Sequence, residues 1–325
     1  MQNHNTFSNL NKKEKDNMTV AIIKGLIMDT VRHANSGHTG GPMSSSDFAY
    51  ILYKEFLKFD PNDPNWFNRD RFILSAGHES ALQYVLLTMI GWLELDDLKK
   101  FRQLHSKTPG HPEIEIDGVE CTTGPLGQGF GMSTGMALAE SFLHNTLKNI
   151  NKEASGLVDH FTYVIASDGD MQEPITLGSA SLSGHLGLSK LIVFYDSNEM
   201  QISGGVSRSD STDYGVIFKG FGWHVQKIDG HDHDSIRIAI REAQKSNQPS
   251  LIIGETIMAK GRDRMEGDFN THGAPLPQDE IDATKIKLGI ESEPFFLPEE
   301  VITYFKSDFQ SQTNKVKSWN NKLTL

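Results

Sequence analysis

The stretch YVIASDGDMQEPITLGSASLSGHLGLSKLIVFYDSNEMQIS, residues 163–203, decides the fold. It begins with a short apolar run, residues 163–166, which stops at the turn SDGD, residues 167–170. A helix rich in small residues follows, and a second apolar run, residues 191–195, stops at DSN, residues 196–198. Two short apolar runs separated by a helix indicate a strand–helix–strand unit. The sequence therefore predicts an α/β fold with a parallel sheet.

Polar side chains stand at the ends of both predicted strands. Ligands of open parallel sheets bind at the carboxyl ends of the strands, and these ends carry Asp168 and Asn198. Their oxygens, with a nearby backbone carbonyl, would supply about half of the octahedral shell of Mg²⁺, and phosphate oxygens and water would complete it. Gly169 would let a phosphate approach the backbone at a helix N-terminus. The alternative is an ordinary strand-ending turn, because Asp and Gly favour turns for conformational reasons alone.

Length and composition limit the class of protein. A chain of 325 residues holds two average domains or one large α/β domain. A net charge of −11 argues against nucleic acid as a partner, and no apolar run approaches the length of a membrane helix. The single Cys121 excludes an internal disulfide and suggests a reducing compartment. The polar first seventeen residues lack the apolar stretch of a signal peptide, so we expect a cytoplasmic enzyme or enzyme subunit.

The remaining pattern predicts further helices and strands around this unit. Apolar residues at three- and four-residue steps predict a helix over residues 20–34, after a loose arm over residues 1–17. The other expected elements are helices over 45–57, 94–104, 128–147 and 236–243 and strands over 71–75, 224–229 and 250–256. Asp232 or Asp234 is expected to cap the helix before which it stands, rather than to bind a metal.

Histidines recur in glycine-containing loops. His38 lies in SGHTGGP, His78 in AGH, His111 in PGH and His272 in THG. Taken alone, the motif favours a surface histidine in a loop for His38, although flanking glycines let a ligand reach the backbone. A zinc helix is excluded after His78 because HExxH fails at Leu82, and acid–base or phosphate contacts suit these histidines better than metal binding.

Two other stretches suggest the edges of a site. The glycine-rich segment TTGPLGQG, residues 122–129, does not match the dinucleotide-binding motif GxGxxG, because Met132 stands where the last glycine would be. Its glycines still let a ligand come close to the backbone before a helix. The loop over residues 259–275 contains Lys260, Arg262 and Arg264 and is expected to form a mobile rim.

Taken together, these motifs resemble the transketolase family. SGHTGGP, NRDRFILSAGH, FRQLHSKTPGHPE, TTGPLGQG, the SDGD–DSN unit, IDGHD and THGAP occur in the family's order and at similar spacings, from about Met18 to the end. The resemblance implies a thiamine-diphosphate-binding fold, a central mostly parallel sheet with helices on both faces. It also implies that the chain is the N-terminal half, or the N-terminal subunit of a split transketolase, because the family's pyrimidine-binding domain has no counterpart here. The implied organisation is a flexible arm (1–17), a pyrophosphate-binding domain (18–300) and a helical tail or linker (301–325).

The resemblance also implies roles for individual residues. Asp168, Asn198 and the Met200 carbonyl would bind Mg²⁺, or Ca²⁺ or Mn²⁺ in its place. The diphosphate would be contacted by His78 and Gly169, with His272 nearby, and Asn198 also belongs to this cofactor site. The implied contacts to the aminopyrimidine come from Gly124 and Leu126, and Glu173 matches a glutamate at the interface with the partner domain. The residues expected around the substrate are His38, His111 and His272.

Some positions depart from the family pattern. Ser167 replaces a usual glycine, and Asp170 stands where an apolar or thiol residue is common. Gly178 replaces a glutamate, and Phe269 stands where a second histidine is frequent. With the three cations of the rim loop, these departures suggest a changed preference among sugar phosphates.

The implied function is thiamine diphosphate- and Mg²⁺-dependent transfer of a two-carbon ketol unit between sugar phosphates. The cofactor supplies the electron sink, and histidines suit the proton transfers near neutral pH. The chain would need a pyrimidine-binding partner, in a homodimer or heterotetramer, and no nucleic acid or membrane. The alternatives are an α-type subunit of a 2-oxo acid dehydrogenase, which would need fewer polyol-binding histidines, and a non-catalytic cofactor-binding module, which would not need them at all.

Overall fold

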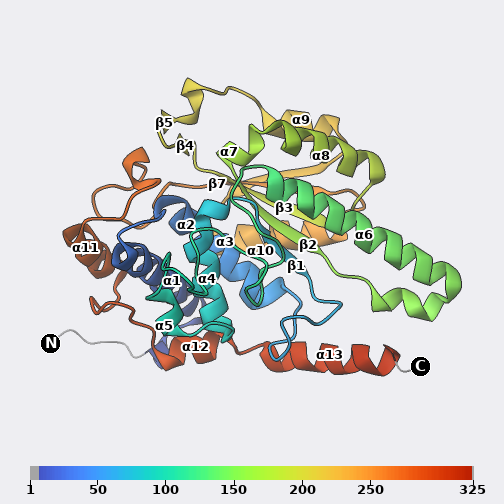
Figure 1. Cartoon of the computed structure of the whole chain (residues 1–325), viewed down its shortest axis with the longest axis horizontal. Coiled ribbons are helices and arrows are strands. Elements are labelled where there is room, and N and C mark those ends of the chain that lie inside the picture. Colours follow the sequence, from blue (N-terminus) through green and yellow to red (C-terminus); the bar gives the residue numbers. More distant parts are fainter. Residues whose placement is uncertain (1–6, 324–325) are drawn as a thin grey trace.

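A five-stranded parallel sheet forms the centre of the computed structural model, which describes residues 7–323 (Figure 1). The strand order is β1 (Arg71–Leu74), β2 (Thr162–Ser167), β3 (Leu191–Ser197), β7 (Ser250–Glu255) and β6 (His224–Asp229), and every neighbouring pair is parallel. A separate antiparallel pair, β4 (Met200–Gln201) and β5 (Gly204–Gly205), follows β3. The predicted α/β fold with a mostly parallel sheet is confirmed.

Both faces of the sheet are buried, which explains why the central strands read as continuous apolar runs. In β2, Tyr163 and Ile165 pack into the larger hydrophobic cluster, and Val164 and Ala166 pack into the smaller cluster on the opposite face. Alternation of side chains along a strand produces this division, since successive side chains point to opposite faces.

Helices cover each face of the sheet (Figure 1). One face is covered by α6 (Gln128–Ile150), α8 (Pro174–Leu186) and α9 (Tyr214–Gly220). The other face is covered by α3 (Ser46–Ile51) and α10 (His233–Lys245), with α1 (Lys12–Ala34) and α4 (Ser80–Ile90) packed beyond them. The remaining helices are α2 (Gly40–Ser44), α5 (Leu95–Leu98), α7 (Asp168–Met171), α11 (Gln278–Leu288), α12 (Glu299–Phe305) and α13 (Phe309–Leu323). Within residues 7–323, no helix is long and apolar enough to cross a membrane.

The predicted flexible arm over residues 1–17 is wrong for its second half. Helix α1 begins at Lys12, where Asn11 and Glu14 form a capping box: the Glu14 N–H donates to Asn11 Oδ1 at 3.0 Å, and the Asn11 N–H donates to Glu14 Oε2 at 2.8 Å. Phe7 is buried in the core, and residues 1–6 lie outside the described part. An Asn followed three residues later by Glu is a helix-start signal that the apolar spacing alone does not reveal.

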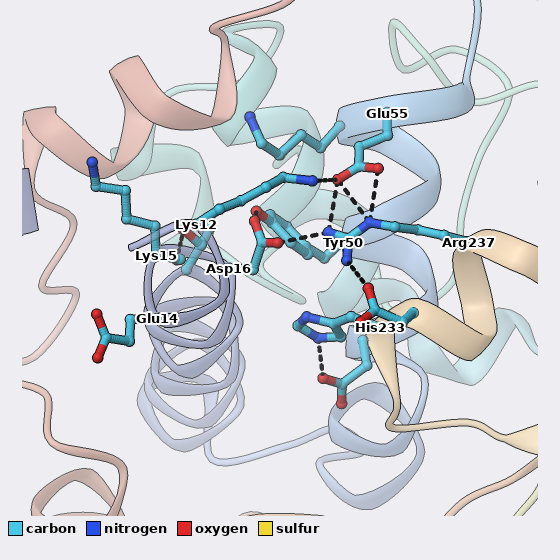
Figure 2. A network of polar contacts seen from close by, with 12 residues as sticks. Lys12, Glu14, Lys15, Asp16, Tyr50, Glu55, His233 and Arg237 are labelled. Carbon is cyan, nitrogen blue, oxygen red and sulfur yellow. Dashed lines mark hydrogen bonds and ion pairs between the residues drawn. The ribbon is translucent and has the colours of Figure 1, made fainter. Parts of the chain in front are cut away.

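Buried polar contacts join α1 to the C-terminal helices. Asp16 accepts hydrogen bonds from the Tyr50 hydroxyl at 2.6 Å, the Tyr304 hydroxyl at 2.7 Å and Arg237 Nη2 at 2.6 Å, and Arg237 also pairs with Glu55 (Figure 2). Burial raises the pKa of Asp16, but these three hydrogen bonds outweigh it and the pKa lies below its ordinary value. The network therefore holds α1, α3, α10 and α12 together.

Two expected boundaries differ from the structure. The division at residue 300 falls inside α12, and its Val301 and Phe305 belong to the larger core cluster, so α12 is part of the domain rather than a tail. The helix expected over residues 94–104 is limited to α5, because Arg102 and His105 both adopt a left-handed backbone with φ of 60°. Residues in that conformation end a right-handed helix.

Candidate cofactor site and active site

A cavity of about 460 Å³ lies at the carboxyl ends of the central strands. All of the site residues predicted from the sequence line it, namely His38, His78, His111, Gly124, Leu126, Asp168, Gly169, Glu173, Asn198, Met200 and His272. They come from loops far apart in the sequence and meet because the carboxyl ends of parallel strands share one edge of the sheet.

Asp168 and Asn198 leave neighbouring strands at this edge. Ser167 pairs with Asp196 in the β2–β3 register, so the two side chains follow the last paired positions of both strands. Asp168 is 3% exposed; its Oδ1 accepts from the Tyr195 hydroxyl at 2.5 Å, whereas its Oδ2 is buried without a hydrogen-bond partner. Burial, with a smaller contribution from the Asp196 carboxyl, raises the pKa of Asp168 to about 7.

This arrangement fits a divalent cation. A buried carboxylate oxygen without a partner is costly unless a donor or a positive charge reaches it. Among the described residues, no group of three His, Cys, Asp or Glu side chains could hold a metal. The predicted set of one carboxylate, one amide and one backbone oxygen would leave a cation in need of further oxygens from its ligand.

Asp196 supports Asn198 and was not recognised from the sequence. The Asp196 carboxyl is fully buried; its Oδ2 accepts from the Asn198 side-chain amide at 2.8 Å and from the Ser44 hydroxyl at 2.6 Å, and its Oδ1 accepts from the Thr256 hydroxyl. The amide donor of Asn198 is therefore engaged, and its Oδ1 accepts from the Met200 N–H at 3.0 Å. The second lone pair of that oxygen is the one that can face a cation. The sequence signal that could have identified Asp196 is its place in the DSN motif, two residues before Asn198.

Three imidazoles form a triangle beside the predicted metal ligands. The ring centroids are 5.0 Å apart for His38 and His78, 5.5 Å for His38 and His272, and 5.3 Å for His78 and His272. The Nδ1 atoms of His38 and His272 are buried and have no hydrogen-bond partner. His111 lies near them, with its ring 3.3 Å from the place where a Cβ on Gly124 would stand.

The histidines are electrically neutral near pH 7. Burial, with contributions from His272, Arg102 and His111, lowers the pKa of His38 to about 4. Burial also lowers the pKa of His78 well below its ordinary value, and that of His111 and His272 to a smaller degree. A neutral imidazole has one donor and one acceptor nitrogen, so each ring can accept a proton or donate a hydrogen bond.

We expect these pKa shifts to make the cofactor-free chain less stable in mild acid. The folded-state pKa of His38, about 4, lies below the unfolded value near 6.5, so below about pH 6.5 the unfolded chain binds a proton that native His38 does not bind. Stability is therefore lost as the pH falls from about 6.5 towards 4, by about 2 kcal/mol at about pH 5 from His38 alone. Urea unfolding at about pH 7.5 and pH 5 should show a smaller loss for His38→Gln than for the wild type. Replacement of the exposed His185 by Gln is the matched control and should leave the loss unchanged.

Glycines bring the two halves of the cavity floor into contact. A Cβ on Gly169 would lie 2.7 Å from Leu126 Cδ1, so the Leu126 side chain covers the turn that follows β2. Gly124 has φ of 150°, a conformation that other residues rarely adopt. The glycine-rich segment thus packs directly on the predicted metal turn.

Glu79 is a further cavity residue that the sequence reasoning missed. Its carboxyl is fully buried, neither oxygen has a hydrogen-bond partner, and a Cβ on Gly41 would lie 2.6 Å from Oε1. Burial raises its pKa well above the ordinary value, which favours the protonated form near neutral pH. The only sequence signal was a glutamate directly after His78.

The three cations of the expected rim loop do not line the cavity. Arg262 is fully buried, with Nη2 3.3 Å from Met265 Sδ, and Arg264 pairs with Asp279 at 2.8 Å. Lys260 pairs with Glu266 at 3.1 Å. None of the three is among the residues that line the cavity, and the suggested change of sugar preference stays a prediction. Asp232 caps α10 as predicted, since its carboxylate accepts from the Ser235 N–H at 3.1 Å.

Fold and cavity together define a class: a parallel α/β domain with a cavity at the carboxyl edge of the sheet, lined by the turn after β2 and by a group of histidines. Comparison with known proteins agrees with this class. The family model described as "Transketolase, thiamine diphosphate binding domain" matches residues 15–325. The transketolase of Staphylococcus epidermidis is 46% identical over 314 residues, which cover 95% of this chain and 47% of that protein.

Solved structures give the same result. Transketolase from Leishmania mexicana superimposes with a TM-score of 0.92 at 38% identity, over 95% of this chain and 46% of that one. A Pichia stipitis transketolase in complex with sedoheptulose 7-phosphate superimposes with a TM-score of 0.91 at 37% identity, over 96% and 46%. The chain belongs to the transketolase family and corresponds to its thiamine diphosphate binding domain, and it spans about half the length of the relatives it matches.

Proposed function

We propose that this chain is the cofactor-binding half of an enzyme that transfers a two-carbon ketol unit between sugar phosphates. The observation that carries the proposal is the meeting, in one cavity, of a buried carboxylate oxygen without a partner and neutral imidazoles without partners. The carboxylate oxygen suits a cation that bridges to a diphosphate, and the imidazoles suit a polyhydroxylated substrate. The sugar phosphate bound to the Pichia stipitis relative is consistent with this substrate class.

The residues present fit a thiamine diphosphate held through Mg²⁺, Ca²⁺ or Mn²⁺. Asp168 Oδ2, the Asn198 amide oxygen and the Met200 carbonyl would bind the cation. His78 and the Gly169 turn would contact the diphosphate, where neutral His78 can donate a hydrogen bond to an oxygen. Gly124 and Leu126 would face the aminopyrimidine.

Each remaining histidine has a role that follows from its protonation state. When bound, thiamine diphosphate supplies the electron sink for the ketol carbanion. His38 and His272, each with an unpartnered Nδ1, can take the proton of a substrate hydroxyl or hydrogen-bond to a carbonyl oxygen. His111, at the more exposed side of the cavity, can contact a further substrate hydroxyl. His38 and His272 are both partly buried, and a partner over the cavity would remove further water from this proton transfer.

A partner chain or domain is proposed to cover the cavity from the side of α6 and α8. The apolar side chains that these helices expose include Leu138, Phe142, Ile175, Leu182 and Leu186, which we call the α6–α8 face. Phe142 is 68% and Leu182 is 46% exposed, and an exposed apolar patch of this kind is typical of an interaction site. Glu173, which lines the cavity, directly precedes α8 and would face the same partner. The pyrimidine-binding domain would come from that partner, within a homodimer or heterotetramer located in the cytoplasm.

Cation-dependent binding of thiamine diphosphate tests the proposal directly. Calorimetric titration of the purified chain should show one site for thiamine diphosphate with Mg²⁺, and EDTA should abolish the binding. Inorganic pyrophosphate with Mg²⁺ should compete, because the cation and the glycine turn would recognise the diphosphate. Binding that is equally tight with EDTA would contradict the cation-bridged site. No binding of either compound, with the partner domain also present, would refute the cofactor role.

A further inference from the structure

Asp170 is a buried carboxylate inside the cavity floor with an unusually complete set of donors. It is fully buried and lies in α7, two residues after Asp168. Its Oδ1 accepts from the Ser75 hydroxyl at 2.6 Å and from the Gly127 N–H at 2.7 Å. Its Oδ2 accepts from the N–H and the hydroxyl of Ser167, both at 2.9 Å. Four donors therefore converge on one carboxylate from three separate segments.

These three segments are the ones that carry the cavity residues. Ser75 directly follows β1 and precedes the turn that contains His78. Gly127 caps α6 and ends the loop that contains Leu126, and Ser167 ends β2 and precedes Asp168. Asp170 therefore connects the segments that carry the proposed diphosphate, aminopyrimidine and cation contacts.

The neighbouring packing leaves little freedom around this carboxylate. Ser75 Oγ also accepts from the Phe130 N–H at 3.0 Å, so the first turn of α6 is tied to the end of β1. A Cβ on Gly129 would lie 2.6 Å from Ser75 Cα, which means that the helix and the strand end are in direct backbone contact. The Asp170 carbonyl accepts from the Thr176 hydroxyl at 2.6 Å and connects the same point to α8.

We propose that Asp170 is a positioning residue that sets the spacing between the α6 loop and the metal turn, with Ser167 as its coupled partner. We further infer that this spacing determines the affinity for thiamine diphosphate. This second step rests on the proposed function. Ser167 and Asp170 bind each other directly: the Ser167 N–H and hydroxyl donate to Asp170 Oδ2, and the Asp170 N–H donates to Ser167 Oγ at 3.4 Å. An aspartate that accepts from several backbone N–H groups orders a turn more strongly than an apolar residue at the same place.

Asn is the informative replacement because it keeps the size of Asp170. Its amide nitrogen is a donor and would face either the Ser75 and Gly127 pair or the two Ser167 donors. Half of the hydrogen bonds would be lost, and at least one buried N–H would lack an acceptor. Asp70→Asn is a matched control, since Asp70 is also buried and accepts from two backbone N–H groups, of Lys58 and Phe161, both at 2.8 Å. Asp70 directly precedes β1, at the end of the sheet opposite to the cavity.

Amide hydrogen exchange of the cofactor-free chain tests the structural part of the proposal. In Asp170→Asn, peptides that cover residues 124–130 and 165–172 should exchange faster than in the wild type. In Asp70→Asn, peptides near residues 58 and 161 should exchange faster, and residues 124–130 should not change. Equal exchange over residues 124–130 in the wild type and Asp170→Asn would overturn the proposal. If Asp170→Asn does not fold, Ser167→Ala, which removes one of the four donors, carries the same comparison.

Cofactor affinity tests the functional part. The dissociation constant for thiamine diphosphate with Mg²⁺ should rise about 10-fold or more in Asp170→Asn, as for other outer-shell residues of metal sites, and less than about 2-fold in Asp70→Asn. Ser167→Ala should have a smaller effect, and the double variant should lose less than the sum of the two, because the residues share hydrogen bonds. Equal affinity losses in Asp170→Asn and Asp70→Asn would mean that Asp170 acts through general stability alone. A wild type that binds no cofactor would refute the proposed function, while the exchange comparison would still decide the role of Asp170.

Discussion

Replacement of Asp168 by alanine is expected to abolish Mg²⁺-dependent binding of thiamine diphosphate, with a rise in the dissociation constant of about a hundredfold or more. The physical reason is that Asp168 is the only carboxylate among the three proposed cation ligands, so its loss removes the negative charge that holds the cation. The amide of Asn198 and the carbonyl of Met200 cannot compensate, because both are neutral. Calorimetric titration with Mg²⁺ and thiamine diphosphate measures the effect.

The same variant should not be less stable than the wild type when the cofactor is absent. In the wild type, Asp168 Oδ2 is buried without a partner, and alanine removes this cost, although the Tyr195 hydroxyl loses its acceptor. The thermal midpoint of the cofactor-free variant should therefore stay near or above that of the wild type, whereas the rise caused by cofactor and Mg²⁺ should disappear. Asp168→Asn should show an intermediate affinity, and Asp117→Ala, at an exposed position, serves as the control. An unchanged cofactor affinity in Asp168→Ala would refute the assigned cation site.

The 325-residue chain assayed alone is expected to show negligible ketol transfer, and addition of a pyrimidine-binding half should restore it. The chain spans 47% of the Staphylococcus epidermidis transketolase, so the other half of that protein has no counterpart in the chain assayed. Within the family resemblance, the glutamate that activates the aminopyrimidine belongs to that other half. The C-terminal half of the Staphylococcus epidermidis protein is a suitable partner, and transfer from xylulose 5-phosphate is the measurement. Full activity of the chain alone would contradict the partner requirement.

The α6–α8 face provides a control for this complementation. Phe142→Glu or Leu182→Glu should prevent the restoration of activity, because a buried, unpaired carboxylate is unfavourable in an apolar contact. Ile238→Glu is the matched control: Ile238 is 59% exposed, but it lies on α10, on the opposite side of the sheet. It should leave complementation unchanged. If all three variants are restored equally, the partner covers a different surface.

Much of the candidate site could be predicted because it is local in sequence. Asp168 and Asn198 each end an apolar run, and the ends of parallel strands meet whatever the rest of the chain does. The histidines in glycine loops were recognisable for a similar reason, since glycines restrict what else such a loop can pack. The resemblance to a family then supplied roles for residues such as Leu126 and Met200, which no local pattern would have indicated.

Other features required the tertiary structure, because a side chain's partner comes from distant segments. From the sequence, Arg262 suggested a cationic rim, but the structure buries it fully. Asp170 was only a departure from the family pattern, but the structure shows that it accepts four hydrogen bonds. The low pKa of His38 likewise depends on burial by loops far along the chain. By itself, then, the sequence determined the strand–helix–strand unit around residues 163–203 and the polar residues that end its two strands, since these follow from short-range periodicity. Only the tertiary structure decided which of those polar groups are paired, buried or left without a partner, because desolvation and hydrogen bonding depend on neighbours that the chain brings together over hundreds of residues.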